Sequence, residues 1–343
     1  MNKNLIIIVS LVIIGIVLTA SWASINFSFK DSSETPSFED KVIVYGALEE
    51  STMKQMIELF EKRHPPVKVD YWRASASSVL SRVLSEVASD NPQFDVVMAS
   101  PYRLKILKEE GAFQKYDPPN AKQYPSKFHF DPNGAITPAF SNTVIGVIYN
   151  TELVKPDEVP SNLFDLLDPK WKGKIAIPDP TQHVSTVQWL YSLQIMFESQ
   201  TEWEEWIKGL GQNEPVFVSS FSPSVEMVMK GECPIAIGYI HKVFTLSEAP
   251  LDYARISPSL ANMYAFALGA QAPHPEAGKL FINFILSKEA MEVLASTGYG
   301  TNFPGIKPPI EDIEKIEVIL MDELSADEYQ KWSQTFSDWL TKT

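Results

Sequence analysis

The sequence predicts an α/β protein built from two interwoven lobes around a central cleft. Short apolar runs of strand length alternate with longer stretches in which apolar residues recur at helical spacing. The first such unit, residues 42–72, has the order strand, helix, strand, which is typical of a βαβ unit with parallel strands. No glycine- or serine-rich linker divides the alternating region. We therefore expect interwoven lobes rather than independent domains in tandem.

In the first part of the chain, proline and serine residues mark the ends of the expected helices. Pro65 and Pro66 end the first helix, because proline lacks the N–H that a helix needs and restricts the residue before it. Ser77 and Ser78 are expected to cap the next helix. The predicted strands are residues 42–45, 67–72 and 94–98, and the predicted helices cover about 53–60, 79–87 and 102–110.

A second α/β unit follows, and the chain is expected to cross between lobes near residues 140–144 and 257–263. The predicted strands are residues 144–149, 175–177, 216–218, 235–239 and 264–268. The predicted helices are residues 185–197, 201–208, 224–229, 276–286, 288–295 and about 327–340. These crossovers assign residues 41–140 and 264–343 to lobe 1 and residues 141–263 to lobe 2.

The N-terminal segment predicts export. Residues 5–20 are almost wholly apolar, follow Lys3, and lead to small residues near Ala20 and Ala23. Residues 1–23 therefore fit either a cleaved signal peptide or a retained membrane anchor. Residues 24–40, rich in serine and acidic residues, are expected to be a polar tether. Either reading places the folded part outside the cytoplasm, in the periplasm or at the cell surface.

Composition excludes several classes of protein. The net charge of −14 argues against nucleic acid as a partner, because phosphate backbones select basic surfaces. The single cysteine, Cys233, cannot form an intrachain disulfide.

We find no Gly-x-Ser-x-Gly elbow, His-Glu-x-x-His motif or P-loop, so no enzyme is predicted. A monomer without a cofactor is expected.

A series of short segments resembles the extracellular solute-binding proteins of ABC importers, in the class similar to ferric-iron binders. The segments, in order, are Val44-Tyr45-Gly46, Leu59-Phe60-Glu61-Lys62, Phe94-Asp95-Val96-Val97, Tyr149-Asn150-Thr151, Asp168-Pro169-Lys170-Trp171-Lys172-Gly173-Lys174 and Ala272-Pro273-His274-Pro275. Together they span about residues 41–308. The resemblance implies the type II periplasmic-binding fold, a small ligand held between two lobes, and a membrane permease as partner. It does not fix the ligand.

Loops at the carboxyl ends of the strands are expected to face the cleft in such a fold. Arg73 and the serines after it lead into a helix, whose N-terminal N–H groups form a ready anion site. A serine N-cap beside a surface arginine is the simpler reading. Hydroxyl residues from both lobes favour an oxyanion or carboxylate ligand over a sugar. The candidate ligand-binding residues are Gly46, Glu49, Arg73, Ser75, Ser77, Ser100, Ser141, Asn142, Ser185, Thr186, Ser220 and Tyr239.

Ferric iron (Fe³⁺) is a second possible transported ligand, with Tyr239 as the best single metal-binding candidate. Ferric-binding relatives carry two adjacent tyrosines in this region, whereas Ile240 follows Tyr239 here. The first-loop histidine of some relatives is also absent, and Glu49 stands in that loop. An exported hydrolase-type enzyme and a membrane-anchored sensor ectodomain on the same fold are the alternative functions.

Overall fold

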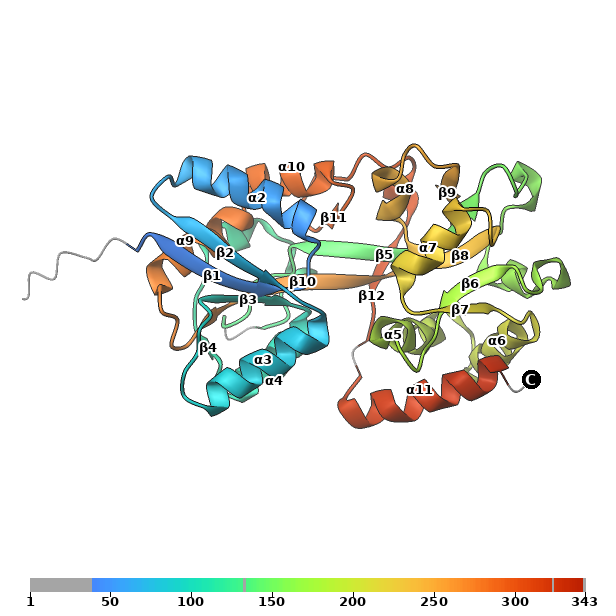
Figure 1. The fold of residues 1–343 in the computed structure, drawn as a ribbon, viewed down its shortest axis with the longest axis horizontal. Coiled ribbons are helices and arrows are strands. Elements are labelled where there is room, and N and C mark those ends of the chain that lie inside the picture. Colours follow the sequence, from blue (N-terminus) through green and yellow to red (C-terminus); the bar gives the residue numbers. More distant parts are fainter. Residues whose placement is uncertain (1–38, 132–133, 323, 342–343) are drawn as a thin grey trace, which may run out of the picture. The chain divides into compact units, whose positions relative to one another are not determined.

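The computed structural model describes residues 39–131, 134–322 and 324–341, and those from Asp40 onwards form one compact unit (Figure 1). In these ranges no helix has both the length and the apolar character needed to cross a membrane. The segment predicted as signal peptide or anchor, and the tether up to residue 38, lie outside the described residues.

Lobe 1 contains the βαβ unit predicted at the start of the domain. Its strands are β1 (Lys41–Gly46), β2 (Lys68–Arg73), β3 (Val96–Ala99) and β4 (Phe113–Gln114). Its helices are α2 (Glu50–Arg63), α3 (Ala76–Ala88), α4 (Pro101–Glu109), α9 (Pro275–Ile285) and α10 (Lys288–Ser296). Strand β1 pairs in parallel with both β2 and β3, which confirms the βαβ prediction.

Lobe 2 repeats the alternation of strands and helices. Its strands are β6 (Ile175–Pro178), β7 (Val216–Val218), β8 (Ile235–Tyr239) and β9 (Leu251–Tyr253). Its helices are α5 (Val184–Ser192), α6 (Gln200–Gln212), α7 (Phe221–Met229), α8 (His241–Thr245) and α11 (Ala326–Thr341). Strand β6 pairs in parallel with β7 and β8.

Two long strands, β5 (Ser141–Asn150) and β10 (Ser259–Gly269), connect the lobes. Strand β10 pairs with β3 of lobe 1 and with β5, and β5 pairs with β8 of lobe 2; all three pairings are antiparallel. The strand order is β2-β1-β3-β10-β5-β8-β6-β7. Both strands begin where the crossovers were expected. Because they run against their neighbours, the sheet is mixed rather than parallel throughout.

The shorter strands β11 (Gly300–Thr301) and β12 (Val318–Leu320) also attach to these connecting strands. Strand β11 pairs with the start of β5, and β12 pairs in parallel with the start of β10. Neither strand was predicted, because segments of two or three residues carry little periodicity; among strands this short, only β7 was predicted.

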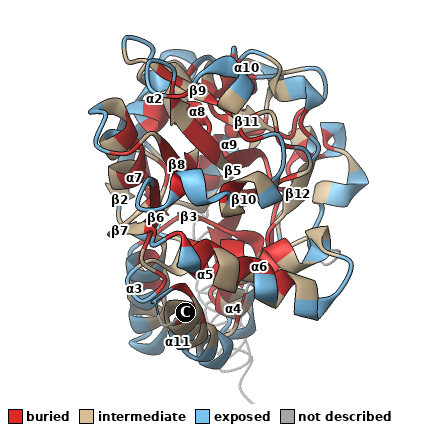
Figure 2. Cartoon of the chain, turned by 90° about the vertical axis from the view of Figure 1, so that its right-hand side faces the viewer, coloured by how far each residue is buried: buried red, intermediate tan, exposed pale blue. Residues whose placement is uncertain are grey.

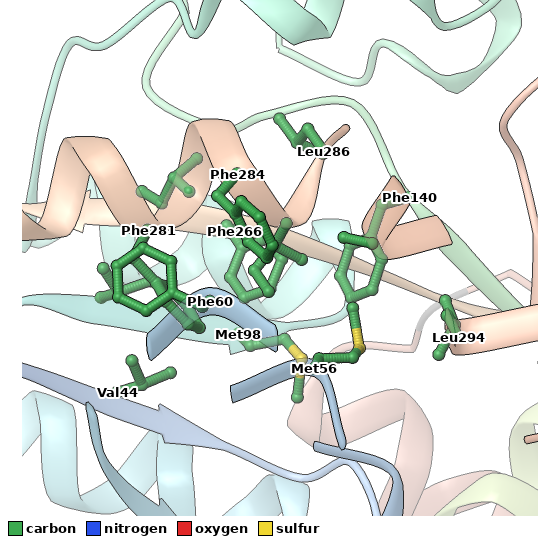
Figure 3. Close-up of a cluster of buried hydrophobic side chains, with 14 of the residues drawn as sticks. Val44, Met56, Phe60, Met98, Phe140, Phe266, Phe281, Phe284, Leu286 and Leu294 are labelled. Atoms are coloured by element: carbon green, nitrogen blue, oxygen red, sulfur yellow. The ribbon is translucent and has the colours of Figure 1, made fainter. Parts of the chain in front are cut away.

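The core of lobe 1 forms where helix α2 packs on helix α9. The ring of Phe60 lies edge-on to Phe281 and Phe284, with centroid distances of 5.2 and 5.4 Å (Figure 3). Met53 and Met56, from the same face of α2, are fully buried. This confirms that the helical spacing of the apolar residues marked a buried face. Figure 2 shows the buried residues concentrated on the strands and on the inner faces of the helices.

The cap of helix α3 differs from the prediction. Ser75, not Ser77 or Ser78, is the N-cap residue, and its hydroxyl oxygen accepts a hydrogen bond from the Ser78 N–H at 3.1 Å. Ser77 and Ser78 lie in the first turn. The helix begins earlier because the Ser75 hydroxyl satisfies one of its free N–H groups. Three serines lie close together here, so the sequence alone does not show which of them is the N-cap.

Helix α11 packs on lobe 2, whereas the sequence placed residues 264–343 in lobe 1. It lies against α5 and α6, and Phe336 is fully buried. The ring of Phe336 contacts Trp203, Trp332 and Trp339 at centroid distances of 5.9, 5.2 and 5.8 Å. The amphipathic pattern predicted that one face of this helix is buried, but such a pattern does not say which surface covers it.

We predict that Phe336→Ala lowers the free energy of unfolding by about 3–5 kcal/mol, because it opens a cavity among the three tryptophans. Urea unfolding followed by circular dichroism measures this. The exposed Gln334→Ala on the same helix serves as the control and should change the free energy by less than about 0.5 kcal/mol. A loss below about 1 kcal/mol for Phe336→Ala would show that α11 contributes little to the fold.

Candidate functional site

The site lies where strand ends of both lobes meet the connecting strands. Neighbouring parallel strands β2, β1 and β3 end at one edge of lobe 1 and lead into α3, α2 and α4. Strand β8 of lobe 2 ends at Tyr239, opposite Ile145 of β5. Side chains from both lobes and from β10 form what we call the interlobe cluster, which consists of Glu49, Tyr71, Tyr239, His241, Lys242, Asn262, Tyr264 and Tyr299.

An ion pair joins the two lobes directly. The Lys242 ammonium on α8 donates to a Glu49 carboxylate oxygen at 2.7 Å, and Glu49 immediately precedes α2 of lobe 1. The side chains are 16% and 35% exposed, so solvent screens the pair only in part. Burial alone would raise the pKa of Glu49, but the hydrogen bond and charge of Lys242 hold that pKa below its usual value. Glu49 is therefore an ionised acceptor.

Three tyrosines of the cluster, Tyr71, Tyr239 and Tyr299, are phenols rather than phenolates in this structure. Burial, followed by the proximity of Tyr264, raises the pKa of both Tyr71 and Tyr239. Burial also raises the pKa of Tyr299, with Glu49 adding to the effect. The Tyr239 hydroxyl oxygen accepts from Asn262 Nδ2 at 3.4 Å, and Ser185 of α5 also bonds this hydroxyl. Tyr71 donates its hydroxyl to the Leu48 carbonyl at 2.9 Å.

His241 lies between two of these tyrosines. Its ring stacks on Tyr299 at 4.4 Å and on Tyr239 at 5.5 Å between centroids. The residue is 4% exposed, and neither ring nitrogen has a hydrogen-bond partner among the described residues. Burial lowers the pKa of His241 to about 3, assisted by the neighbouring Lys242 and opposed by Glu49. A neutral imidazole here has one donor and one acceptor free for a ligand or for water.

Two further buried hydroxyls lie on strand β5 near the cluster. Ser141 is paired with Tyr264, and Thr143 with Asn262, so each shares a sheet face with a cluster residue. Neither hydroxyl has a hydrogen-bond partner within the described ranges. Because unpaired buried polar groups are costly, these atoms indicate a place for a polar ligand or for ordered water.

Close backbone approach explains Gly46 at the end of β1. A Cβ atom there would lie 2.7 Å from the Met98 Cε atom and 3.1 Å from the Tyr71 hydroxyl. Its carbonyl accepts from the Ala74 N–H at 3.0 Å, which joins the loops after β1 and β2. Gly46 thus brings the loop with Glu49 beside the loop with Arg73.

Most of the other predicted residues lie at helix starts around this site. Arg73 is exposed at the end of β2, and the hydroxyl oxygens of Ser75 and Ser100 accept from first-turn N–H groups of α3 and α4. Ser77 is exposed in the first turn of α3. Ser220 occupies the N-cap position of α7 and makes no side-chain cap bond.

Two predicted residues are engaged elsewhere. The Asn142 amide donates to Asn302 Oδ1 at 2.8 Å, and the register places Asn142 opposite Met263 and Gly300. Thr186 is fully buried, and its hydroxyl pairs with His183 Nδ1 at 2.9 Å. Adjacent residues of a strand face opposite sides of the sheet. Ser141 and Asn142 are adjacent on β5, so their place in the sequence could not show which of them faces the cluster.

The sequence-based candidates did not include six residues of the cluster, namely Tyr71, His241, Lys242, Asn262, Tyr264 and Tyr299. Lys242 lies three residues after the candidate residue Tyr239, and this closeness in the sequence could have marked it as part of the site. Tyr264 and Asn262 lie on β10, which read as a crossover rather than as part of the site. Tyr299 follows α10, and nothing in its surroundings marked it.

The donor set limits the metals that the site can hold. In the described part of the chain, no three His, Cys, Asp or Glu side chains are grouped closely enough to bind a metal ion. The cluster offers phenol oxygens and one carboxylate instead. Hard oxygen donors of this kind suit Fe³⁺ better than softer metals, provided that the phenols lose their protons.

Comparison with known proteins agrees with the fold. Residues 55–317 match the family of bacterial extracellular solute-binding proteins. A Salmonella typhimurium LT2 periplasmic protein with a proposed role in binding 2-aminoethylphosphonate is 25% identical over 280 residues, 79% of each chain. Iron uptake protein A1 of Synechocystis sp. PCC 6803 is 24% identical over 291 residues, 78% of this chain and 77% of that protein.

A solved structure shows the same fold. Iron-bound HitA from Pseudomonas aeruginosa superposes with a TM-score of 0.72 at 16% identity, covering 86% of this chain and 99% of HitA. The two-lobed α/β architecture is therefore that of the type II periplasmic-binding proteins. The chain belongs to the bacterial extracellular solute-binding proteins. It is a binding protein of an ABC importer, not an enzyme, and it works outside the cytoplasm.

We predict that His241→Gln weakens the pH dependence of stability below pH 6.5. Because the folded-state pKa is about 3, below the ordinary value of 6.5, neutral His241 contributes stability that is lost as the pH falls from 6.5 towards 3. The variant should reduce the slope of unfolding free energy against pH by about 1.4 kcal/mol per unit between pH 4 and 6.

His183 supplies a matched comparison for this experiment. Burial lowers its pKa to about 4, so His183→Gln should reduce the slope over a narrower range that ends near pH 4. Urea unfolding at a series of pH values measures both variants. If His241→Gln leaves the slope of the wild-type chain intact, the imidazole is not held neutral by burial.

Proposed function

We propose that the solute is a small zwitterion with an oxyanion at one end and an ammonium group at the other, in the class of the aminophosphonates. The observation that carries this proposal is the opposite charge at two adjacent strand ends. Gly46 and Arg73 are register partners on β1 and β2, and Glu49 follows Gly46 by three residues. Arg73 lies close enough to Glu49 to help lower the pKa of that carboxyl.

The oxyanion end is assigned to Arg73 and the start of helix α3. Arg73 is exposed, and the first turn of α3 presents N–H groups together with the Ser77 hydroxyl. A helix N-terminus carries partial positive charge and favours an anion. The charge-assisted bonds of arginine suit the planar or tetrahedral oxygens of a carboxylate or phosphonate.

The cationic end is assigned to Glu49, with the tyrosine hydroxyls and neutral His241 lining the space beside it. The Salmonella relative supports the same class of solute by its proposed ligand, 2-aminoethylphosphonate. On this proposal Lys242 competes with the ammonium group of the solute for Glu49, so binding rearranges the interlobe ion pair.

Ferric iron is a second candidate ligand, favoured by four tyrosines in one cluster. Tyr71, Tyr239, Tyr264 and Tyr299 provide hard oxygen donors, and relatives include an iron uptake protein and iron-bound HitA. Binding would have to displace phenol protons, since burial raises the pKa of Tyr71, Tyr239 and Tyr299. No resident cofactor is proposed.

The remaining parts of the proposal concern location and partner. We propose that the chain acts as a monomer and delivers its solute to an ABC permease in the membrane. Residues 1–23 would direct export, either as a cleaved signal or as a retained anchor. The family and the periplasmic relatives support the location outside the cytoplasm and the delivery of a solute to a permease.

Calorimetric titration with 2-aminoethylphosphonate and with ethylphosphonate, which lacks the amine, tests the assignment of charges. Glu49→Gln should weaken binding of the aminophosphonate at least about tenfold, the equivalent of about 1.4 kcal/mol, and leave ethylphosphonate nearly unaffected. Arg73→Ala should weaken both. Arg63→Ala, an arginine paired with Glu289 at the other end of α2, is the control and should change neither. Equal losses for both ligands in Glu49→Gln would refute a cation subsite at Glu49.

Visible absorption spectroscopy on addition of ferric citrate tests the second candidate. Coordination of Fe³⁺ by phenolate should produce an intense ligand-to-metal charge-transfer band, and Tyr239→Phe should weaken or shift it. Tyr102→Phe, outside the cluster, serves as the control and should leave the band unchanged. No band at saturating ferric citrate would remove iron from consideration, whatever the outcome with phosphonates.

A further inference from the structure

A cavity of about 420 Å³ lies at the junction of the two lobes, beside strand β5. Its walls include residues 142–144 of β5, Ile240, Ile306 and Ile310. His241 of the interlobe cluster and Thr143 beside the cluster line this cavity, whereas Glu49, Arg73, Tyr239 and Tyr264 do not. The cavity therefore adjoins the proposed solute site and shares His241 with it, but it does not include Glu49 or Arg73.

We propose that this cavity is a second binding site, which takes an uncharged and largely apolar small molecule. Its lining is rich in isoleucine, with Ile240, Ile306, Ile310, Ile313 and Ile316 all contributing. The volume falls within the range of about 300–1,000 Å³ typical of small-molecule sites. Since a cavity of about 150 Å³ accommodates benzene, this one has room for roughly two or three rings.

The charges at the border of the cavity do not favour an anion or a cation. Lys127 and Lys307 contribute two positive charges, and Glu314 and Glu317 contribute two negative charges. All four residues are exposed, and their charges sum to zero, so they give an ion no net attraction. Polar groups also stand in the wall, and they suit an occupant that is mainly apolar but has a hydrogen-bonding group; they belong to Asn142, Thr143, His241, Thr301 and Asn302.

The two lobes contribute opposite walls. Ile306 packs on the core of lobe 1, whereas Ile310, Ile316 and Val318 pack with Ile148 and Val225 of lobe 2. A molecule in the cavity therefore touches both lobes at once. It must favour the lobe arrangement that preserves both walls, because a ligand shifts an equilibrium by its differential affinity for the two states.

Binding of N-phenyl-1-naphthylamine, an uncharged three-ring probe whose fluorescence rises in apolar sites, tests the proposal on the full chain. We expect saturable binding that weakens at least tenfold in Ile310→Trp and in Ile306→Trp, which fill the cavity from opposite lobes. Ile195→Trp, at a position 64% exposed on lobe 2, is the matched control and should bind the probe as the wild-type chain does.

Unfolding midpoints show whether each filled variant is folded, and Ile313→Phe provides a milder filling at a half-buried position. Probe affinity that is unchanged in all the folded filled variants, or no saturable binding to the wild-type chain, would overturn the proposal. Loss of probe binding in Arg73→Ala would place the probe at the solute site and would also overturn it. The outcome does not depend on which solute the chain transports.

Discussion

Strands β5 and β10 pair with each other where the two lobes meet, and the arrangement of the site depends on this pairing. Strand β10 also pairs with β3 of lobe 1, and β5 also pairs with β8 of lobe 2. Ser141, Thr143, Asn262 and Tyr264 therefore belong to neither lobe alone. They sit where the two sets of strand ends converge. Any relative movement of the lobes must bend or twist these strands, and it would therefore alter the candidate site.

The interlobe cluster combines buried polar groups that the protein itself does not satisfy. His241, Ser141 and Thr143 are buried without hydrogen-bond partners in the described ranges, whereas Tyr239 and Tyr71 already bond protein atoms. A core optimised only for stability would pair or remove such groups. Their retention at the meeting point of two lobes is consistent with a surface that becomes complete when a solute or water is present.

The sequence was sufficient for the strands and helices with strong periodicity, and for the loops that approach the site. Glu49, Arg73, Ser185 and Tyr239 were chosen because strand ends face the cleft in this fold, and the structure brings these loops together. The sequence was insufficient where the position of a residue or helix depends on which elements pair or pack together in the fold. Asn142 and Ser141 are adjacent, yet only one of them faces Tyr264, and helix α11 could have covered either lobe. Tyr299 reaches the cluster because the chain turns between α10 and β11, and this turn has no recognisable pattern in the local sequence.

The ion pair between Glu49 and Lys242 has a consequence for the setting in which this protein works. A cell regulates the salt concentration of its cytoplasm far more closely than that of its surroundings. Because both side chains retain some exposure, added salt weakens their attraction. Any movement that separates Glu49 from Lys242 is thus easier in a medium of high salinity than in one of low salinity.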